Sequence, residues 1–236
     1  IGPNRSLSGN NPYTNLGGSP WGTSNVMAKV SGITKTNNSV YRDNHASGHC
    51  AKMTTHIETC KVLGLINIKV LAAGSIFLGD MKEPITGTKD GPKALNFGIP
   101  FTHRPKALRY DYKVQVPGTP NRIRQTGFSK VTTVPGPDYC IAMLLLQKRH
   151  EDANGNITAQ RVGTVVVKYG KSTGGWVEDA TYEIHYGNIT GKSFYNAATM
   201  GLRSHDYARN SKGKSVLVKE TGWAPADATP THIVLQ

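Results

Sequence analysis

Five side chains of the types that bind metals lie between residues 45 and 60. They are His45, His49, Cys50, His56 and Cys60. Imidazole and thiolate are the ligands that zinc prefers in proteins. However, the Ala-Ser-Gly sequence between His45 and His49 is typical of a turn that leads into a strand. In extended chain a four-residue step spans about 13 Å, which is too far for two ligands of one ion. Polar loop histidines are therefore the favoured interpretation, and the sequence predicts no metal site.

Carboxylates that could hydrolyse a glycosidic bond are present, but the sequence does not pair them. A glycosidase needs two carboxylates that face each other across the bond. The candidates are Glu58, Asp80, Glu83, Asp90, Asp111, Asp138, Glu178, Asp179 and Glu183. Any domain of this size carries as many acids, and the histidines show no spacing that marks a triad. The catalytic residues, if the protein is an enzyme, are unknown from the sequence.

Residues 151–156, Glu-Asp-Ala-Asn-Gly-Asn, superficially resemble a calcium-binding loop. The segment lacks the terminal bidentate glutamate and the regular oxygen spacing of such a loop, so a solvated hairpin tip is favoured. No Walker loop or dinucleotide-binding glycine motif occurs. The sequence thus predicts no cofactor and leaves structural calcium elsewhere in the chain open.

Three tryptophans are the strongest candidates for ligand contact. Trp21, Trp176 and Trp223 each lie among glycines or prolines, which places their rings at loops or strand ends. Such rings can stack on the apolar face of a sugar, or they can cap the core instead. Ligand pockets combine a few aromatic rings with convergent polar groups. Asn25 and Arg104 supply such groups, and we predict all five residues as ligand-binding.

The charge of the chain favours anionic partners without choosing among them. Its 236 residues carry 28 Lys and Arg against 15 Asp and Glu, a formal net charge of +13. The bases are scattered singly, so the field is diffuse. Such a field suits acidic polysaccharide, membrane headgroups or nucleic acid. No helix-turn-helix, zinc-finger or RRM signature occurs, so nucleic acid is not the predicted partner.

The cysteine count and the hydropathy set two further limits. Three cysteines, Cys50, Cys60 and Cys140, are too few for a disulfide framework. Buried thiols are favoured, and a Cys60–Cys140 bridge is the alternative. No apolar stretch reaches the roughly 18 residues of a membrane span. We therefore predict no transmembrane segment, and the sequence does not indicate an oligomeric state.

The hydrophobic pattern is that of β-structure almost throughout. In residues 106–116 apolar and aromatic residues alternate with polar ones, which predicts a strand with one buried face. Eight further segments rich in β-branched or aromatic residues predict strands. They span residues 26–30, 50–56, 65–77, 139–148, 161–168, 180–186, 215–220 and 231–235.

These strands predict one all-β domain over residues 1–236. Two packed antiparallel sheets, as in a jelly roll, fit about nine strands with frequent turns, and a closed barrel is the alternative. Asn154–Gly155 supplies the positive φ angles that a hairpin tip needs. Residues 79–100 and 117–137 are expected to form long loops, where ligands often bind.

Three groups of residues are together similar to the signatures of one family. The first is Asn-Pro-Tyr at 11–13 with Ser-Pro-Trp-Gly-Thr-Ser-Asn at 19–25. The second is Cys-Ala-Lys-Met-Thr-Thr at 50–55 with Leu-Ala-Ala-Gly-Ser-Ile-Phe-Leu-Gly at 71–79. The most specific is Pro-Phe-Thr-His-Arg-Pro-Lys-Ala-Leu-Arg-Tyr-Asp-Tyr-Lys at 100–113. They resemble the "putative carbohydrate metabolism domain" of surface proteins in polysaccharide-using Gram-negative bacteria.

The resemblance implies a jelly-roll-like antiparallel β-sandwich similar to carbohydrate-binding modules. It also implies a secreted protein or a lipoprotein of the outer-membrane cell surface. In the family a Ser-rich loop and an acidic strand follow the strand near residues 230–234, whereas this sequence stops at Gln236. We therefore expect the domain to lack its C-terminal strand.

Three hypotheses of function follow. The first is a non-catalytic domain that binds polysaccharide or oligosaccharide, with acidic glycans suited to its charge. The second is a glycoside hydrolase or polysaccharide lyase on the same scaffold, with paired carboxylates or a Tyr or His base beside Arg or Lys. The third is a surface adhesion or structural module that binds another protein.

Overall fold

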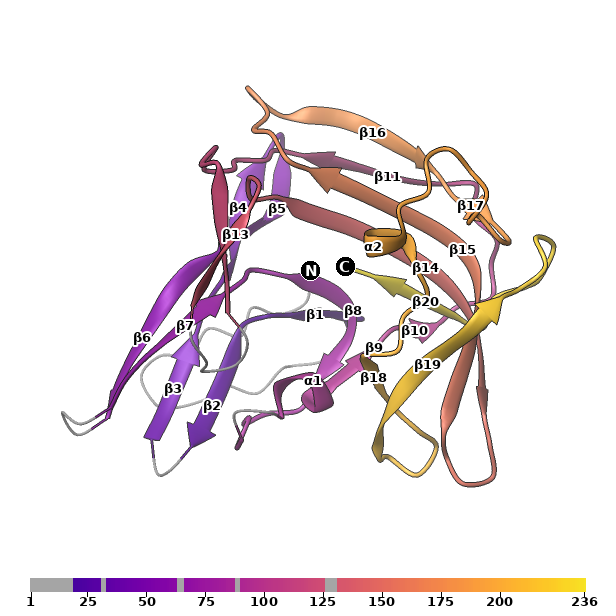
Figure 1. The fold of residues 1–236 in the computed structure, drawn as a ribbon, viewed down its shortest axis with the longest axis horizontal. Coiled ribbons are helices and arrows are strands. Elements are labelled where there is room, and N and C mark those ends of the chain that lie inside the picture. Colours follow the sequence, from indigo (N-terminus) through magenta and orange to yellow (C-terminus); the bar gives the residue numbers. More distant parts are fainter. Residues whose placement is uncertain (1–18, 31–32, 63–65, 88–89, 126–130) are drawn as a thin grey trace. The chain divides into compact units, whose positions relative to one another are not determined.

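The chain is an all-β protein, as predicted. The computed structural model describes residues 19–30, 33–62, 66–87, 90–125 and 131–236. These residues form twenty β-strands and two helices, arranged in several mostly antiparallel sheets (Figure 1). Each helix has only 4 residues. None of the helices in these ranges is long and apolar enough to cross a membrane.

Two compact units make up the chain. The N-terminal unit contains residues 1–97 and 125–132, and the C-terminal unit contains residues 98–124 and 133–236. The expectation that residues 1–236 act as one domain without its last strand stays a prediction.

The N-terminal unit is built from one three-stranded sheet and three hairpins. The sheet has the order β1-β8-β9, and the hairpins are β2-β3, β4-β5 and β6-β7. Its small core includes Phe77 and Phe97, whose ring centroids are 5.6 Å apart. The elements are β1 (Trp21–Thr23), β2 (Val26–Val30), β3 (Ile33–Asn37), β4 (Val40–His45), β5 (Gly48–Met53), β6 (His56–Val62), β7 (Ile66–Ala72), β8 (Ile76–Met81), α1 (Gly91–Ala94) and β9 (Leu95–Phe97).

Two long strands expected in this unit are each broken into two. The expected strand 50–56 ends at Met53, and the Thr54 N–H still bonds the Ser39 carbonyl at 2.8 Å in the register of the hairpin. The expected strand 65–77, whose first residue lies outside the described residues, breaks between β7 and β8 at Gly74. A Cβ at Gly74 would lie 2.6 Å from the Thr54 nitrogen and 2.7 Å from the Ser39 oxygen. Close approach of these backbones interrupts both strands.

The C-terminal unit contains a seven-stranded sheet. Its order is β10-β20-β14-β15-β19-β18, and β17 pairs with β15. The pairing of β15 with β19 is parallel, a departure from the purely antiparallel sheet that was expected. The elements of the unit are β10 (Ile99–Pro100), β11 (Ala107–Tyr112), β12 (Asn121–Arg124), β13 (Thr132–Pro135, whose first residue belongs to the N-terminal unit), β14 (Cys140–Glu151), β15 (Ile157–Tyr169), β16 (Val177–Glu183), β17 (His185–Tyr186), α2 (Ala197–Met200), β18 (Asp206–Arg209), β19 (Ser215–Trp223) and β20 (His232–Leu235).

The β14–β15 hairpin forms the centre of this sheet and confirms the predicted turn. Gly155 has a φ of 87°, and its N–H donates to the Asp152 carbonyl at 2.9 Å. The Asp152 N–H donates to the Asn156 carbonyl at 3.0 Å, which closes the loop. Both strands extend further toward this turn than predicted, because β14 continues to Glu151 instead of residue 148 and β15 begins at Ile157 instead of residue 161.

A second layer, made of β11 and β16, packs against β15. Half-buried Leu108, Tyr110 and Tyr112 alternate along β11 with exposed residues, as predicted, but the strand ends at Tyr112 and not at residue 116. Tyr110 and Tyr182 both contact Tyr169 of β15 through their hydroxyls. Burial raises the pKa of Tyr110 to about 12, so this hydroxyl remains protonated within the layer interface. Two packed layers of strands give this unit a sandwich arrangement.

The two long loops expected from the sequence contain regular structure instead. Residues 79–100 include the end of β8 together with α1, β9 and β10. Residues 117–137 include β12 and β13, with residues 126–130 outside the described residues. These strands are short, and strands of two to four residues are too brief to show a clear alternation.

Candidate functional site

An open hollow with a volume of about 570 Å³ lies on the β4–β5 hairpin of the N-terminal unit. Five of its six lining residues are polar or charged, and the sixth is a tyrosine. The lining residues are Tyr41, Arg42, Asp43, Lys52, Thr54 and His56.

The register of the hairpin brings the main side chains of the hollow together. Tyr41 of β4 pairs directly with Lys52 of β5, so the two side chains project from the same face. Asp43, two residues along β4, shares that face because successive side chains alternate. The Lys52 ammonium lies 3.9 Å from an Asp43 carboxylate oxygen. Val40 is 4% exposed and anchors the start of β4 in the core.

The aromatic ring of the hollow is presented to solvent. Tyr41 is 46% exposed, and its hydroxyl donates to the Asn38 carbonyl at 2.6 Å, which restricts the ring. His56 lies beside Glu58, with 3.0 Å between an imidazole nitrogen and a carboxylate oxygen. An exposed ring beside hydroxyl, ammonium and carboxylate groups can stack on a sugar and bond its hydroxyls.

Asn25, one of the predicted ligand residues, positions this hairpin. Its side-chain oxygen accepts from the Ser39 and Val40 N–H groups at 2.8 Å each. Its side-chain nitrogen donates to the Val40 carbonyl at 2.8 Å. The residue is only 5% exposed, so the amide holds the start of β4 and through it Tyr41. Trp21 lies on β1 of the same unit and is half-buried. Direct ligand contact by either residue stays a prediction.

The other three predicted residues lie in the C-terminal unit on separate elements. Arg104 precedes β11, stacks over the Tyr186 ring at 4.1 Å and donates to the Ala226 and Ala228 carbonyls. Trp223 ends β19 and lies under the Arg161 guanidinium at 5.5 Å. Trp176 precedes β16 and is 36% exposed. The structure therefore divides the five predicted residues between the units, and their ligand contacts stay predictions.

His45, His49 and Cys50 of the histidine and cysteine cluster lie on one hairpin. The turn predicted between His45 and His49 is present at Ala46 and Ser47, so the extended four-residue step assumed between them is wrong. The His49 Nδ1 lies 3.0 Å from the Asn44 side-chain oxygen, and its Nε2 contacts the Arg42 guanidinium. Both nitrogens of this ring thus have polar neighbours within the hairpin.

The predicted burial of the cysteines is only partly correct. Cys50 is half-buried and Cys140 is exposed, and both are free thiols. The exposure of Cys140 corrects the prediction that it is buried, since it lies at the first position of β14, where the sheet ends. The free thiol of Cys140 contradicts the alternative of a Cys60–Cys140 bridge, and the side chain of Cys60 lies outside the described residues.

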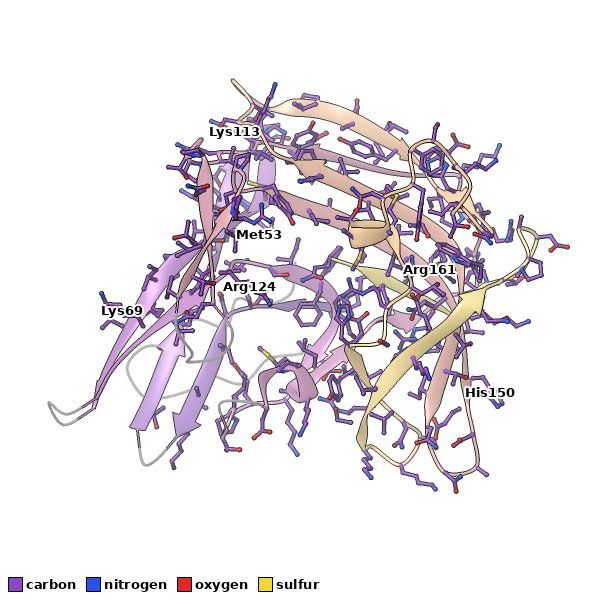
Figure 2. The ribbon with its side chains drawn as sticks, viewed as in Figure 1. Met53, Lys69, Lys113, Arg124, His150 and Arg161 are labelled. Carbon is purple, nitrogen blue, oxygen red and sulfur yellow. The ribbon has the colours of Figure 1, made fainter. Side chains whose placement is uncertain are left out.

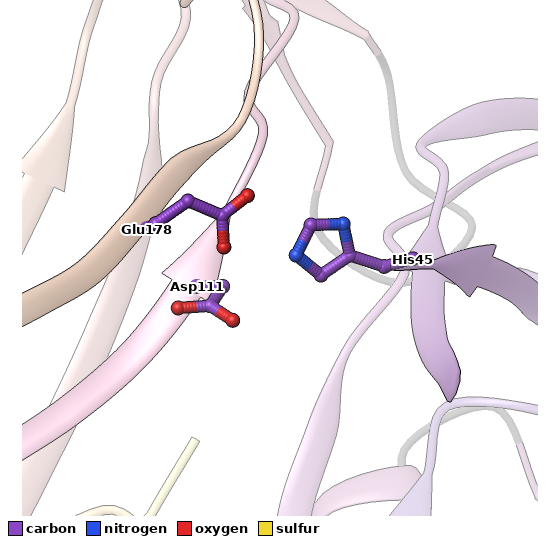
Figure 3. Close-up of side chains that lie close together, drawn as sticks. All are labelled: His45, Asp111 and Glu178. Carbon is purple, nitrogen blue, oxygen red and sulfur yellow. The ribbon is translucent and has the colours of Figure 1, made fainter. Parts of the chain in front are cut away.

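Two carboxylates of the C-terminal unit lie close together on paired strands (Figure 3). Oxygens of Asp111 on β11 and Glu178 on β16 are within 4.8 Å of each other. His45, also drawn in Figure 3, belongs to the N-terminal unit. Retaining glycosidases hold their carboxyl groups about 5 Å apart, but their general acid needs a desolvated environment to raise its pKa. Both Asp111 and Glu178 are exposed, which argues against that role.

A buried ionic network supports the C-terminal unit. Arg161 and Glu220 both have 0% side-chain exposure and form an ion pair. Arg161 also donates to the Met200 and Gly201 carbonyls, both at 3.3 Å, which ties the end of α2 to β15 (Figure 2). Glu220 further accepts from the Gln147 side chain and the Arg203 N–H, each at 2.7 Å. This network fixes the sheet rather than offering groups to a ligand.

One histidine beside this network is desolvated. Burial, with the positive charge of Arg149, lowers the pKa of His232 from 6.5 to about 4. Burial also lowers the pKa of Arg149 to about 10. His232 is therefore neutral near pH 7, and its protonation would destabilise the folded state.

Most residues of the hollow were missed by sequence reasoning. His56 was considered only as a metal ligand, and residues 40–45 were not predicted as a strand. A recognisable signal was present, because the chain can turn at Ala46 and Ser47 between two segments of six residues. Pairing across such a turn would have placed Tyr41 opposite Lys52.

The protein is thus β-rich and carries a surface site with one aromatic ring and several polar groups. The model of one family, named "Putative carbohydrate metabolism domain", matches residues 7–207. The chain therefore belongs to this family, as its sequence motifs indicated, and is a domain related to carbohydrate metabolism. No curated protein sequence and no solved structure matches the chain.

Proposed function

We propose that this protein is a carbohydrate-binding domain that holds polysaccharide or oligosaccharide without cleaving it. The observation that carries the proposal is the exposed Tyr41 ring in a polar hollow. A sugar ring stacked on Tyr41 would place its hydroxyls within reach of Asp43, Lys52 and Thr54. Membership of a carbohydrate metabolism family supports a sugar as the ligand.

We propose the cellular setting of this activity from the family resemblance alone. A secreted protein or an outer-membrane surface lipoprotein of a Gram-negative bacterium would meet polysaccharide outside the cell. A domain in that position would capture glycan for other proteins to degrade. Cell fractionation with an antibody against the protein tests this part of the proposal.

A polysaccharide lyase is the second candidate, and the hollow supplies a specific reason for it. Lyases abstract a proton next to a carboxylate and need a Tyr or His base beside a positive group. Tyr41 and His56 line the same hollow as Arg42 and Lys52. Production of unsaturated sugar, followed by ultraviolet absorbance, would favour this candidate over binding alone.

Affinity electrophoresis against a panel of neutral and acidic polysaccharides tests the binding proposal. We expect Tyr41→Ala to weaken retention about tenfold, and Tyr41→Phe to keep most of it because the ring remains. Phe194→Ala is the matched control, since Phe194 is 42% exposed and lies in the other unit. Circular dichroism shows whether each variant folds. Absence of retention by every glycan would overturn the proposal.

A further inference from the structure

We infer that the hollow recognises an anionic saccharide, with Lys52 pairing with a carboxylate or sulfate on the sugar. This inference rests on the proposed function and names the ligand class of the same site. The hollow is lined by two basic residues, Arg42 and Lys52, and by one carboxylate, Asp43. Lys52 is the basic residue on the face of Tyr41, because Arg42 lies between Tyr41 and Asp43 on β4 and projects from the opposite face of the hairpin.

Lys52 retains the capacity to bind a further anion. Its ammonium has three donors, and Asp43 at 3.9 Å occupies at most one of them. The side chains of Lys52 and Asp43 are 59% and 50% exposed. An exposed ion pair of this kind is weak, so Asp43 competes only slightly with a second anion for the Lys52 ammonium.

The other basic groups near the hollow are less well placed for this ligand. His56 lies 3.0 Å from Glu58, so a charge on its ring would be balanced by that carboxylate. Arg42 contacts His49 through its guanidinium and lies on the face of the hairpin opposite Tyr41. Lys52 is thus the cation best placed for the ligand, because the register sets it directly opposite Tyr41. Ring stacking and charge pairing would then act on one sugar residue.

Matched saccharides that differ only in charge test the inference. Oligogalacturonate and its methyl ester share rings and linkages, and dextran sulfate and dextran form the corresponding pair for sulfate. We expect the free acid or the sulfate ester to bind at least tenfold more tightly than its neutral partner in calorimetry. This preference should shrink as salt is added, because salt screens exposed charges. The two pairs together show which anion is preferred.

Substitution of the lysine separates this inference from the proposed function. We expect Lys52→Met to weaken binding of the charged saccharide about ten- to a hundredfold and binding of the neutral partner by less than about fivefold, because the neutral sugar loses only a hydrogen bond. Lys52→Arg should restore most of the loss. Lys69→Met is the control, since Lys69 is exposed on β7 of the same unit (Figure 2). Equal binding of charged and neutral partners, or an unaffected Lys52→Met variant, would overturn the inference alone. Absence of binding by any saccharide would overturn both.

Discussion

The buried pair of Arg161 and Glu220 gives the sharpest prediction about stability. Glu220→Gln keeps the shape of the side chain but leaves the Arg161 charge uncompensated at 0% exposure. Breaking a buried pair from one side costs about 3–5 kcal/mol in the free energy of unfolding. Glu220 and Asp206 both act on the charges of Arg149 and Arg203, so loss of the Glu220 charge leaves these two arginines less compensated as well.

Urea unfolding followed by circular dichroism measures this effect. With a typical m-value of about 2 kcal/mol per molar, the loss lowers the midpoint for the C-terminal unit by about 2 M. The matched control is Asp179→Asn in the exposed Arg109–Asp179 pair, whose atoms are 3.5 Å apart with 67% and 73% exposure. Exposed pairs contribute less than about 1 kcal/mol, so this variant should barely shift the midpoint.

A double-mutant cycle attributes the loss to the pair itself. Arg161→Met combined with Glu220→Leu removes both charges, and the cycle should show a coupling of at least about 2 kcal/mol. The fluorescence of Trp223, which lies 5.5 Å from the Arg161 guanidinium carbon, reports on the same region. If Glu220→Gln costs no more than the Asp179→Asn control, the reasoning about the uncompensated charge is wrong.

Three further predictions concern other parts of the chain. Asn25→Ala removes three hydrogen bonds to the start of β4, so we expect a loss of about 2–4 kcal/mol in stability and weaker glycan binding, whereas Asn25→Asp should keep the two accepted bonds. Gly74→Ala places a methyl group 2.6 Å from the Thr54 nitrogen, so thermal unfolding should begin earlier, while Gly175→Ala, with no atom within 4 Å, should not change it. His232 has a pKa lowered from 6.5 to about 4, so the unfolded state binds its proton first as pH falls through that window. As the pH falls from 6.5 to about 4, this group should lower the free energy of unfolding by about 1–2 kcal/mol, after allowance for its partial exposure. In the His232→Gln variant the free energy of unfolding should change less over this pH range.

Local sequence signals predicted the β class and several of its elements. The alternation over residues 106–116 appears in part as β11, which ends at Tyr112, and the Asn154–Gly155 pair lies in the β14–β15 turn. These predictions succeed because side-chain alternation and positive φ angles depend on neighbouring residues. The motif at residues 100–113 also pointed to the family that the chain belongs to.

Long-range pairing decided where strands break and which residues meet. Sequence reasoning joined β5 to the start of β6 and β7 to β8, because nothing local shows that Gly74 packs against Thr54. The partners Arg161 and Glu220 are 59 positions apart, and only the sheet brings them together. Contacts of this kind depend on register and packing, which alternation alone does not specify.

By itself, therefore, the sequence determined that this protein is β-rich, basic and a member of a carbohydrate metabolism family. The tertiary structure alone decided that Asn25 is a buried support for β4 and that Tyr41 is the exposed ring beside Lys52. The physical reason is that exposure and cross-strand pairing belong to the folded chain. A residue type states what chemistry a side chain can perform, and the register of the hairpin sets which chemistries share one surface.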